Sequence, residues 1–210
     1  MEIKLRLEEE KDYRLIEELT REAFWNVHFP GCGEHLLVHK LRKADEFVKG
    51  LDFVALYDNK IAGNIVYAKA KVKDNGKEHT VLTFGPVSVL PEYQNRGIGS
   101  KLINHTVKLS KEMGYKAIII YGYPEYYKKF GFTASKEKEI TNSEKKYPAA
   151  LLVLELYPNA LNGIKGVFDE GAIYEINEKE LEEFDKEFDK KEKTVTKSQE
   201  KFMETATKFL

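Results

Sequence analysis

The first third of the chain changes from strand-like alternation to helical spacing of its apolar residues. Apolar and charged residues alternate over residues 3–7, which predicts a half-buried strand. Apolar residues then recur every three or four positions over residues 15–24, as they do on one face of a helix. A loop rich in aromatic and polar groups, residues 24–35, leads into a second predicted helix over 36–48.

Three apolar, β-branched stretches follow and are separated by short turns. Strands are predicted at 53–57, 61–73 and 80–90. The turns between them carry Asp58-Asn59-Lys60 and Asn75-Gly76, residues that favour tight hairpins. The three strands should therefore form an antiparallel meander.

The pattern then becomes helix, strand, short helix and two strands. An amphipathic helix is predicted over 101–114, and the continuously apolar segment 117–121 indicates a strand buried on both faces. Together with the preceding strand they form a right-handed parallel unit. A short helix is expected over 124–131, because proline suits its start and glycine its end. Strands are predicted at 149–157 and 171–174.

The C-terminal segment differs in composition from the rest. Asn177 is suited to cap a charged helix whose narrow apolar stripe is Leu181, Phe184 and Phe188, and the stripe pattern returns over 202–210. Such stripes usually pack, either on the same chain or on a second subunit. We therefore predict a main domain at 1–176 and a helical extension at 177–210. A homodimer is one of the two arrangements that such packing allows.

The junction between residues 80–90 and the helix after it carries the strongest chemical signal. The turn contains Gly97 and Gly99, which have no Cβ, so an anion can approach the free amides that begin the helix. A P-loop is excluded because Ser100-Lys101 lacks the earlier glycine that the motif needs. A dinucleotide fingerprint is excluded because Leu102 stands where its third glycine belongs.

The motif Gln94-x-x-Gly97-x-Gly99 after a strand with Val87-Ser88-Val89 resembles the coenzyme A loop of the GNAT superfamily, the acyl-CoA-dependent N-acyltransferases. The order of elements over about residues 2–175 resembles GNAT as well. The resemblance implies a mixed α/β fold: a mostly antiparallel central sheet flanked by helices, with a V-shaped splay between the strands at 80–90 and 117–121. It also implies acetyl-CoA as co-substrate, bound by Val87, Val89, Gln94, Asn95, Arg96, Gly97, Ile98, Gly99 and Ser100.

A proline inside the strand at 80–90 supports that resemblance. Proline cannot donate to a sheet ladder, so Gly85-Pro86 predicts a bulge or an unpaired edge. Beyond the break, the backbone of Val87 and Val89 can face a ligand. In the family, these positions pair with the pantetheine arm of the coenzyme.

Tyr127 is the candidate general acid. Tyr-x-x-x-Gly-Phe, which ends at Phe132, resembles the GNAT segment near the coenzyme sulfur, and by that resemblance Tyr127 protonates the departing thiolate. Tyr126 offers the same chemistry with the opposite orientation, but its offset from Gly131 does not match. The expected gain is modest because a thiol of pKa about 8.5 is already a fair leaving group.

The acceptor side has no motif that can be carried over. His28, Glu34 and His35 lie in the loop at 24–35 and are candidate acceptor-binding residues. Each is also a candidate for the base that takes the amine's proton, and a water chain is an equal alternative. His35 and His39 have the spacing of two metal ligands, but surface histidines on one helix face are the better interpretation. No metal is expected.

Composition limits the remaining alternatives. With 210 residues, a net charge of −1 and no apolar run of about 20 residues, the sequence favours a protein that binds neither nucleic acid nor membranes. The single cysteine, Cys32, suits the reducing cytoplasm. The leading hypothesis is an N-acetyltransferase in which an amine attacks acetyl-CoA directly in a ternary complex. The alternative is an acyl-CoA-binding sensor or interaction module without turnover.

Overall fold

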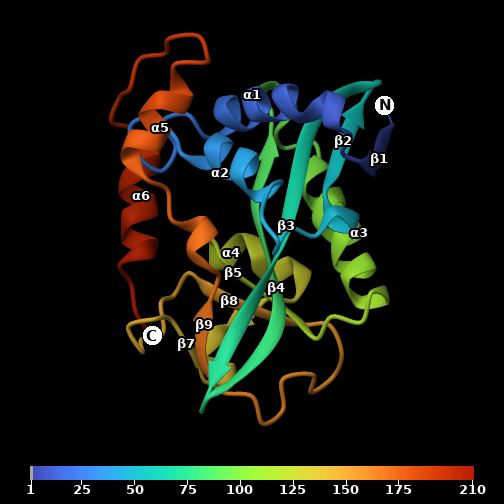
Figure 1. The fold of residues 1–210 in the computed structure, drawn as a ribbon, viewed down its shortest axis with the longest axis vertical. Helices are drawn as coiled ribbons and strands as arrows, with labels where there is room; N and C mark the ends of the chain where they lie inside the picture. Colours follow the sequence, from blue (N-terminus) through green and yellow to red (C-terminus); the bar gives the residue numbers. More distant parts are fainter. Residues whose placement is uncertain (1) are drawn as a thin grey trace.

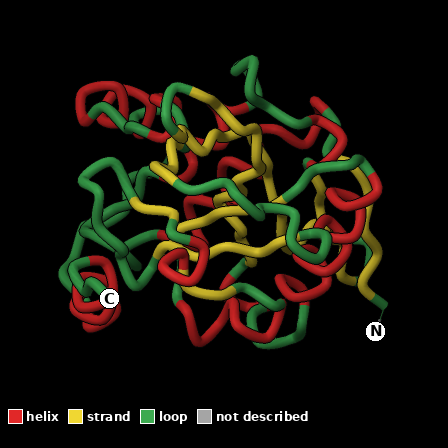
Figure 2. The backbone as a smooth tube through the Cα atoms, turned by 90° about the horizontal axis from the view of Figure 1, so that it is seen from below, coloured by secondary structure: helices red, strands yellow, loops and turns green. Residues whose placement is uncertain are grey.

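A nine-stranded sheet forms the centre of the protein, and helices cover both of its faces (Figures 1 and 2). The computed structural model describes residues 2–210. The main strand order is β1-β2-β3-β4-β5-β8-β6, and β9 lies between β3 and β7. Within the described part of the chain, only the β4–β5 and β7–β9 pairs are parallel. The strands are β1 (Ile3–Leu7), β2 (Phe53–Tyr57), β3 (Lys60–Asp74), β4 (Lys77–Val89), β5 (Ala117–Tyr121), β6 (Thr133–Ala134), β7 (Ile140–Thr141), β8 (Leu151–Glu155) and β9 (Gly166–Asp169). The predicted mixed, mostly antiparallel architecture is confirmed.

The helices divide between the two faces of the sheet. They are α1 (Tyr13–Phe24), α2 (Glu34–Leu41), α3 (Ile98–Glu112), α4 (Pro124–Tyr127), α5 (Glu178–Asp185) and α6 (Lys197–Ala206). Leu102 and Ile103 of α3 pack on Leu82 and Ile118, on one face of the sheet. Apolar residues of α1 and α2 pack on β2 and β3 on the other face. Among the described residues, no helix is long and apolar enough to cross a membrane.

Farther along the same face of the sheet, below α1 and α2 in Figure 1, strands rather than a helix cover the core. Val81 of β4, Ile119 of β5 and Phe168 of β9 belong to one buried cluster there. This cluster forms because β9 pairs with the far half of β3, with Val72 opposite Phe168. The α1–α2 face therefore has a helical upper part and a strand-covered lower part.

A bulge interrupts β4 at the predicted position. Ile65 of β3 lies opposite Val87, and Tyr67 lies opposite Phe84, so that Gly85 and Pro86 together occupy one position of the ladder. The Gly85–Pro86 peptide bond is cis. The expected bulge is confirmed, and it lies just beyond the pairing of β4 with β5 at Leu82.

Two predicted elements were wrong. The helix expected to reach residue 48 ends at Leu41, because the chain then runs beside β3: Phe47 bridges Ala68, and the Val48 amide donates to the Tyr67 carbonyl at 3.0 Å. Residues 171–174 were expected to form a strand, but 172–174 form a 3-10 turn. Gly171 has a φ of +89°, which ends the extended backbone of β9 before this turn.

Candidate active site

The β4–α3 connection presents the free amides of α3 to a cavity. After β4 the chain makes a 3-10 turn at Pro91–Tyr93, and the side-chain amide of Gln94 donates to the Val89 carbonyl at 3.2 Å. Gly97 precedes α3 with a φ of +82°, a left-handed conformation that glycine adopts at little cost. The first amides of α3 lack intrahelical partners and carry the positive end of the helix dipole. This end of α3 is therefore suited to bind an anion.

A cavity of about 540 Å³ lies at this end of α3. Its walls include eight of the nine predicted coenzyme-binding residues: Val87, Val89, Gln94, Asn95, Gly97, Ile98, Gly99 and Ser100. Arg96 is not among the lining residues. Its guanidinium instead donates to the Tyr57 hydroxyl at 3.3 Å and lies 5.7 Å from the centre of the Tyr93 ring. The sequence did not indicate Ala23, Phe24, Tyr93 and Lys129, which also line the cavity. No spacing signal marks them, because they come from α1, the turn and the α4 segment.

The wall formed by β4 has one edge without a strand neighbour. Val87 and Val89 pair with Ile65 and Gly63 of β3 on one side. On the other side, β4 meets β5 only where Leu82 lies opposite Ile118. Between the described residues, the two parallel strands therefore separate beyond Leu82, which leaves backbone groups of β4 able to pair with an extended ligand.

Tyr127 and Tyr126 both line the cavity but are placed differently. The Tyr127 ring packs 5.6 Å from Phe132 and lies over Gly122, where an added Cβ would be only 2.3 Å from Tyr127 Cε2. The Tyr126 hydroxyl lies at the other wall, 3.1 Å from the position of a Cβ on Gly99. Burial raises the pKa of Tyr127 well above its ordinary value. The phenol is protonated at neutral pH, as an ordinary tyrosine is, and the raised pKa makes it a weaker acid.

The three candidate acceptor residues lie in two different environments, with His28 in the α1–α2 loop and Glu34 and His35 at the start of α2. His28 Nδ1 lies 2.8 Å from Glu34 Oε1, and the His28 ring stacks on Phe202 of α6 at 4.3 Å. Its ring also lies 5.5 Å from that of Phe24, which lines the cavity. The His28–Glu34 pair thus lies next to the cavity wall without being part of it.

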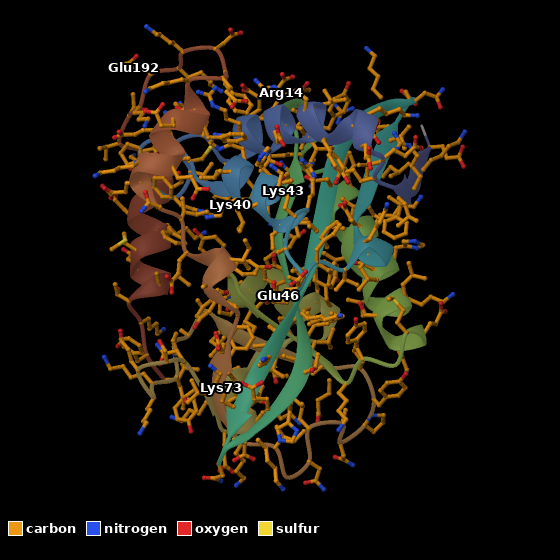
Figure 3. The ribbon with its side chains drawn as sticks, viewed as in Figure 1. Arg14, Lys40, Lys43, Glu46, Lys73 and Glu192 are labelled. Carbon is orange, nitrogen blue, oxygen red and sulfur yellow. The ribbon has the colours of Figure 1, made fainter. Side chains whose placement is uncertain are left out.

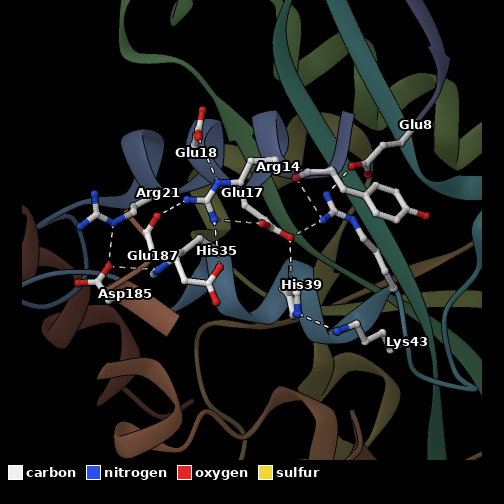
Figure 4. Close-up of polar contacts among 12 residues, drawn as sticks. Glu8, Arg14, Glu17, Glu18, Arg21, His35, His39, Lys43, Asp185 and Glu187 are labelled. Atoms are coloured by element: carbon white, nitrogen blue, oxygen red, sulfur yellow. Dashed lines mark hydrogen bonds and ion pairs between the residues drawn. The ribbon is translucent and has the colours of Figure 1, made fainter. Parts of the chain in front are cut away.

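His35 is completely buried, so its interpretation as a surface histidine was wrong. Its Nδ1 lies 3.4 Å from Cys32 Sγ, and its Nε2 lies 3.4 Å from Asp185 Oδ1, as Figure 4 shows for the latter contact. Burial lowers the pKa of His35 to about 4, so the imidazole is neutral at pH 7. Burial also raises the pKa of the Cys32 thiol, which opposes nucleophilic reactivity. Within residues 2–210, no group of three or more potential ligands is arranged to hold a metal.

The C-terminal extension packs against the acceptor candidates, which the sequence could not show. Arg21 Nε of α1 donates to Asp185 Oδ1 at 2.8 Å (Figure 4), and Lys40 of α2, labelled in Figure 3, pairs with Glu180 at 2.8 Å. The Asn26 side chain donates to the Glu192 carbonyl at 3.0 Å. The extension therefore covers α1, α2 and the loop between them.

The last helix, α6, contacts both that loop and the segment that follows β5. Phe202, in the middle of α6, stacks on His28, and Lys201 Nζ lies 5.9 Å from the ring of Tyr123, between β5 and α4. Beyond α6, the Lys208 carbonyl accepts from the Ala149 amide at 2.8 Å, just before β8. Figure 1 shows α6 running along this side of the molecule. The extension thus contacts both the α1–α2 loop and the segments next to β5 and β8.

Comparison with known proteins agrees with this geometry. Residues 4–135 match the model of the acetyltransferase (GNAT) domain family. The uncharacterized N-acetyltransferase YjhQ of Escherichia coli is 29% identical over 113 residues, which are 54% of this chain and 59% of that protein. The uncharacterized N-acetyltransferase YhbS of the same organism is 26% identical over 149 residues, 70% of this chain and 87% of YhbS. The match to YjhQ thus spans less than two thirds of that relative.

Two solved structures share the fold over most of the chain. YhbS from Escherichia coli in complex with CoA superposes with a TM-score of 0.71 and 25% identity, covering 82% of this chain and 91% of YhbS. A GNAT acetyltransferase from Brucella melitensis in complex with acetyl-CoA gives a TM-score of 0.66 and 27% identity, covering 83% and 99%. The family match over residues 4–135 is decisive: the chain belongs to the GNAT family of N-acetyltransferases.

Proposed function

We propose that this protein transfers the acetyl group of acetyl-CoA to a primary amine by direct attack within a ternary complex. The observation that carries the proposal is the cavity at the start of α3, where the glycine turn and the unpaired edge of β4 meet. The complexes of YhbS with CoA and of the Brucella melitensis protein with acetyl-CoA support the choice of co-substrate.

Two parts of the cavity suit a pyrophosphate-bearing coenzyme: the start of α3 and the free edge of β4. A Cβ on Gly97 would meet no atom within 4 Å, so the space above this backbone is open, and Gly99 faces the Tyr126 hydroxyl. The amides there would hold the diphosphate by charge-assisted hydrogen bonds. The free edge of β4 at Val87 and Val89 would pair with the amide-containing pantetheine arm. Arg96 contributes less, because its side chain turns toward Tyr57.

Tyr127 then has the role of protonating the thiolate as it leaves. Its hydroxyl carries a proton at neutral pH, and its ring is held between Phe132 and Gly122. Proximity and orientation of the two substrates supply most of the rate gain, and the acid adds a smaller factor. His28 and Glu34 border the side from which the amine approaches.

The proposal is tested by thiol release from acetyl-CoA with putrescine, glucosamine, kanamycin, lysine and a short peptide as acceptors. Release that depends on one acceptor, with an acetylated product of the expected mass, supports the transferase. Tight binding of acetyl-CoA without release in any assay would instead favour the sensor or interaction module. Sedimentation of the same sample tests whether the protein is a homodimer. A cytoplasmic location also remains a proposal, supported by the single buried cysteine.

A further inference from the structure

A carboxylate and two tyrosines gather at the splay, on the face of the sheet opposite α3. Phe168 of β9 faces the buried cluster that contains Val81 and Ile119. Side chains alternate along a strand, so Asp169 points away and Glu170, one residue beyond β9, returns to the side of Phe168. Glu170 therefore lies on the α1–α2 face, in its strand-covered lower part.

The electrostatic effect of Glu170 on two tyrosines of neighbouring elements supports this position. The Tyr121 ring, at the end of β5, lies 6.1 Å from that of Phe168, and the charge of Glu170 helps to raise the pKa of Tyr121 to about 12, after the larger effect of burial. The same charge acts on Tyr174. The Tyr174 hydroxyl is buried beside Thr83 without a hydrogen bond of good geometry. The carboxylate thus lies among β5, β4 and the turn after β9.

This position is where the gap between β4 and β5 opens. Leu82 is the last described residue of β4 that pairs with β5, and Thr83 follows it directly. Two residues farther, Gly85 begins the bulge, and a Cβ added there would meet no atom within 4 Å. The space above the bulge is therefore open on the side that faces away from α3, where an acceptor can approach the splay.

Glu170 is the carboxylate at this place that is not already engaged. Asp169 pairs with Lys73, labelled in Figure 3, at 2.5 Å, and it also accepts from the Gly171 amide. Glu144 pairs with Lys146 at 2.7 Å. Within residues 2–210, the Glu170 carboxylate makes no hydrogen bond or ion pair. Burial, with a smaller effect of Asp169, raises the pKa of Glu170 to about 7, which suits a base that works near neutral pH.

We propose that Glu170 is the general base that takes the proton from the acceptor nitrogen during acetyl transfer. The inference rests on the proposed function. The nitrogen lone pair of the neutral amine forms the new C–N bond, and the C–S bond breaks with its electron pair going to sulfur. The surplus proton on nitrogen goes to the Glu170 carboxylate, while the thiolate takes a proton from the Tyr127 hydroxyl or from water. Solvent then restores both side chains.

The test compares pH profiles of kcat/KM for the whole protein, Glu170→Gln and Glu170→Asp, with the active amine from the five-member acceptor panel. The wild type should gain activity as pH rises through about 7, because the base must be deprotonated. Glu170→Gln should lose about 100-fold at pH 8 together with this acidic limb. Glu170→Asp should keep the limb at a reduced rate, which a purely structural role would not produce.

Two further variants make the assignment specific. Glu144→Gln removes another charge that acts on Tyr121 and should leave the profile unchanged. His28→Gln should keep the acidic limb, whereas loss of the limb in that variant would transfer the role to the His28–Glu34 pair. The inference is overturned if Glu170→Gln retains both rate and limb, or if Glu170→Asp loses the limb. Acetyl-CoA binding, measured by calorimetry, should be equal in all variants.

Failure of the proposed function gives a different result. If the wild type binds no acetyl-CoA and releases no thiol with any of the five amines, the proposed function fails, and the role of Glu170 fails with it. If the wild type is active and Glu170→Gln matches it at every pH, only the role of Glu170 is overturned.

Discussion

The proposed coenzyme side and the proposed acceptor side of this protein are built in different ways. Most of the coenzyme side is one continuous stretch, in which β4, a turn and α3 bring Val87 to Ser100 together around the cavity. The acceptor side is assembled from the α1–α2 loop, the end of β9 and the C-terminal extension, which are far apart in the sequence. A local site can be recognised from its motif, whereas an assembled site becomes visible only after folding.

We expect the largest effect from deleting residues 177–210, because the deletion alters the acceptor side and leaves the coenzyme side in place. The deletion removes the packing of Phe184 on His35 and the Arg21–Asp185 ion pair. Each buried aromatic ring contributes about 2 kcal/mol, so we expect the melting temperature to fall by about 10 °C or more. Cys32, now buried, should become reactive toward a thiol reagent. Affinity for acetyl-CoA should change little. Unchanged melting and unchanged oligomeric state would show that the extension does not stabilise the domain.

A single substitution sharpens that result. Asp185→Ala leaves the Arg21 side chain, only 4% exposed, without its carboxylate, and a broken buried pair costs about 3–5 kcal/mol. Glu183→Ala is the matched control, because its pair with Lys186 lies on the surface and such pairs contribute about 1 kcal/mol or less. Thermal unfolding of both variants measures the difference. Equal melting of the two would contradict the importance of the buried pair.

On the coenzyme side, Gly97→Val should weaken acetyl-CoA binding by about 100-fold or more, because a side chain would fill the space over the amides of α3. Gly76→Val is a close control: its φ of +81° matches the +82° of Gly97, and neither added Cβ meets an atom within 4 Å. Both variants should therefore carry the same backbone strain. Calorimetry with acetyl-CoA measures the affinity of each variant. Equal affinities would show that the glycine turn is not part of the binding site.

Tyr127→Phe should reduce turnover by about 10- to 100-fold, since the low pKa of a thiol limits the benefit of an acid. The ring and its contact with Phe132 remain, so acetyl-CoA affinity should stay nearly constant. Steady-state kinetics of Tyr127→Phe and Tyr126→Phe near neutral pH provide the comparison. A loss confined to Tyr126→Phe would place the acid one residue earlier, at the hydroxyl beside Gly99.

Arg96→Ala should have the smallest effect, about 1 kcal/mol in acetyl-CoA binding or less, because an exposed cation near phosphate is screened by salt. The Arg96 side chain also donates to the Tyr57 hydroxyl and does not line the cavity. Binding measured at low and at high salt should differ more for the wild type than for the variant. A loss as large as that of Gly97→Val would contradict the backbone-centred model of the site.

The fold was predictable because its strands follow strict local rules. Alternation marked β1, the turns at Asn59 and Asn75-Gly76 marked the meander, and Gly85-Pro86 marked the bulge. The errors arose where contacts distant in the sequence override local pattern. Apolar Phe47 suggested a longer helix, but it pairs with the edge of β3.

The candidate site was predictable only in part, for the same reason. Glycine spacing indicated the α3 turn, but nothing in the sequence around Glu170 shows that it comes to lie near Tyr121. His35 illustrates the limit as well. Its position near a loop suggested solvent contact, yet Phe184 and Asp185, about 150 residues later in the chain, bury it.

The attachment of the extension at two distant places has a consequence for its dynamics. One end is held at Asn26 and the other beside β8, where the Leu210 amide donates to the Tyr147 carbonyl at 2.9 Å. Once one end is bound, the other rebinds as an intramolecular partner at an effective concentration that short connections raise to the millimolar range. Opening of α6 therefore requires both anchors to release together, so individually weak contacts can keep α6 in place for long periods. An acceptor that enters past α6 would have to displace a helix that is attached at two places.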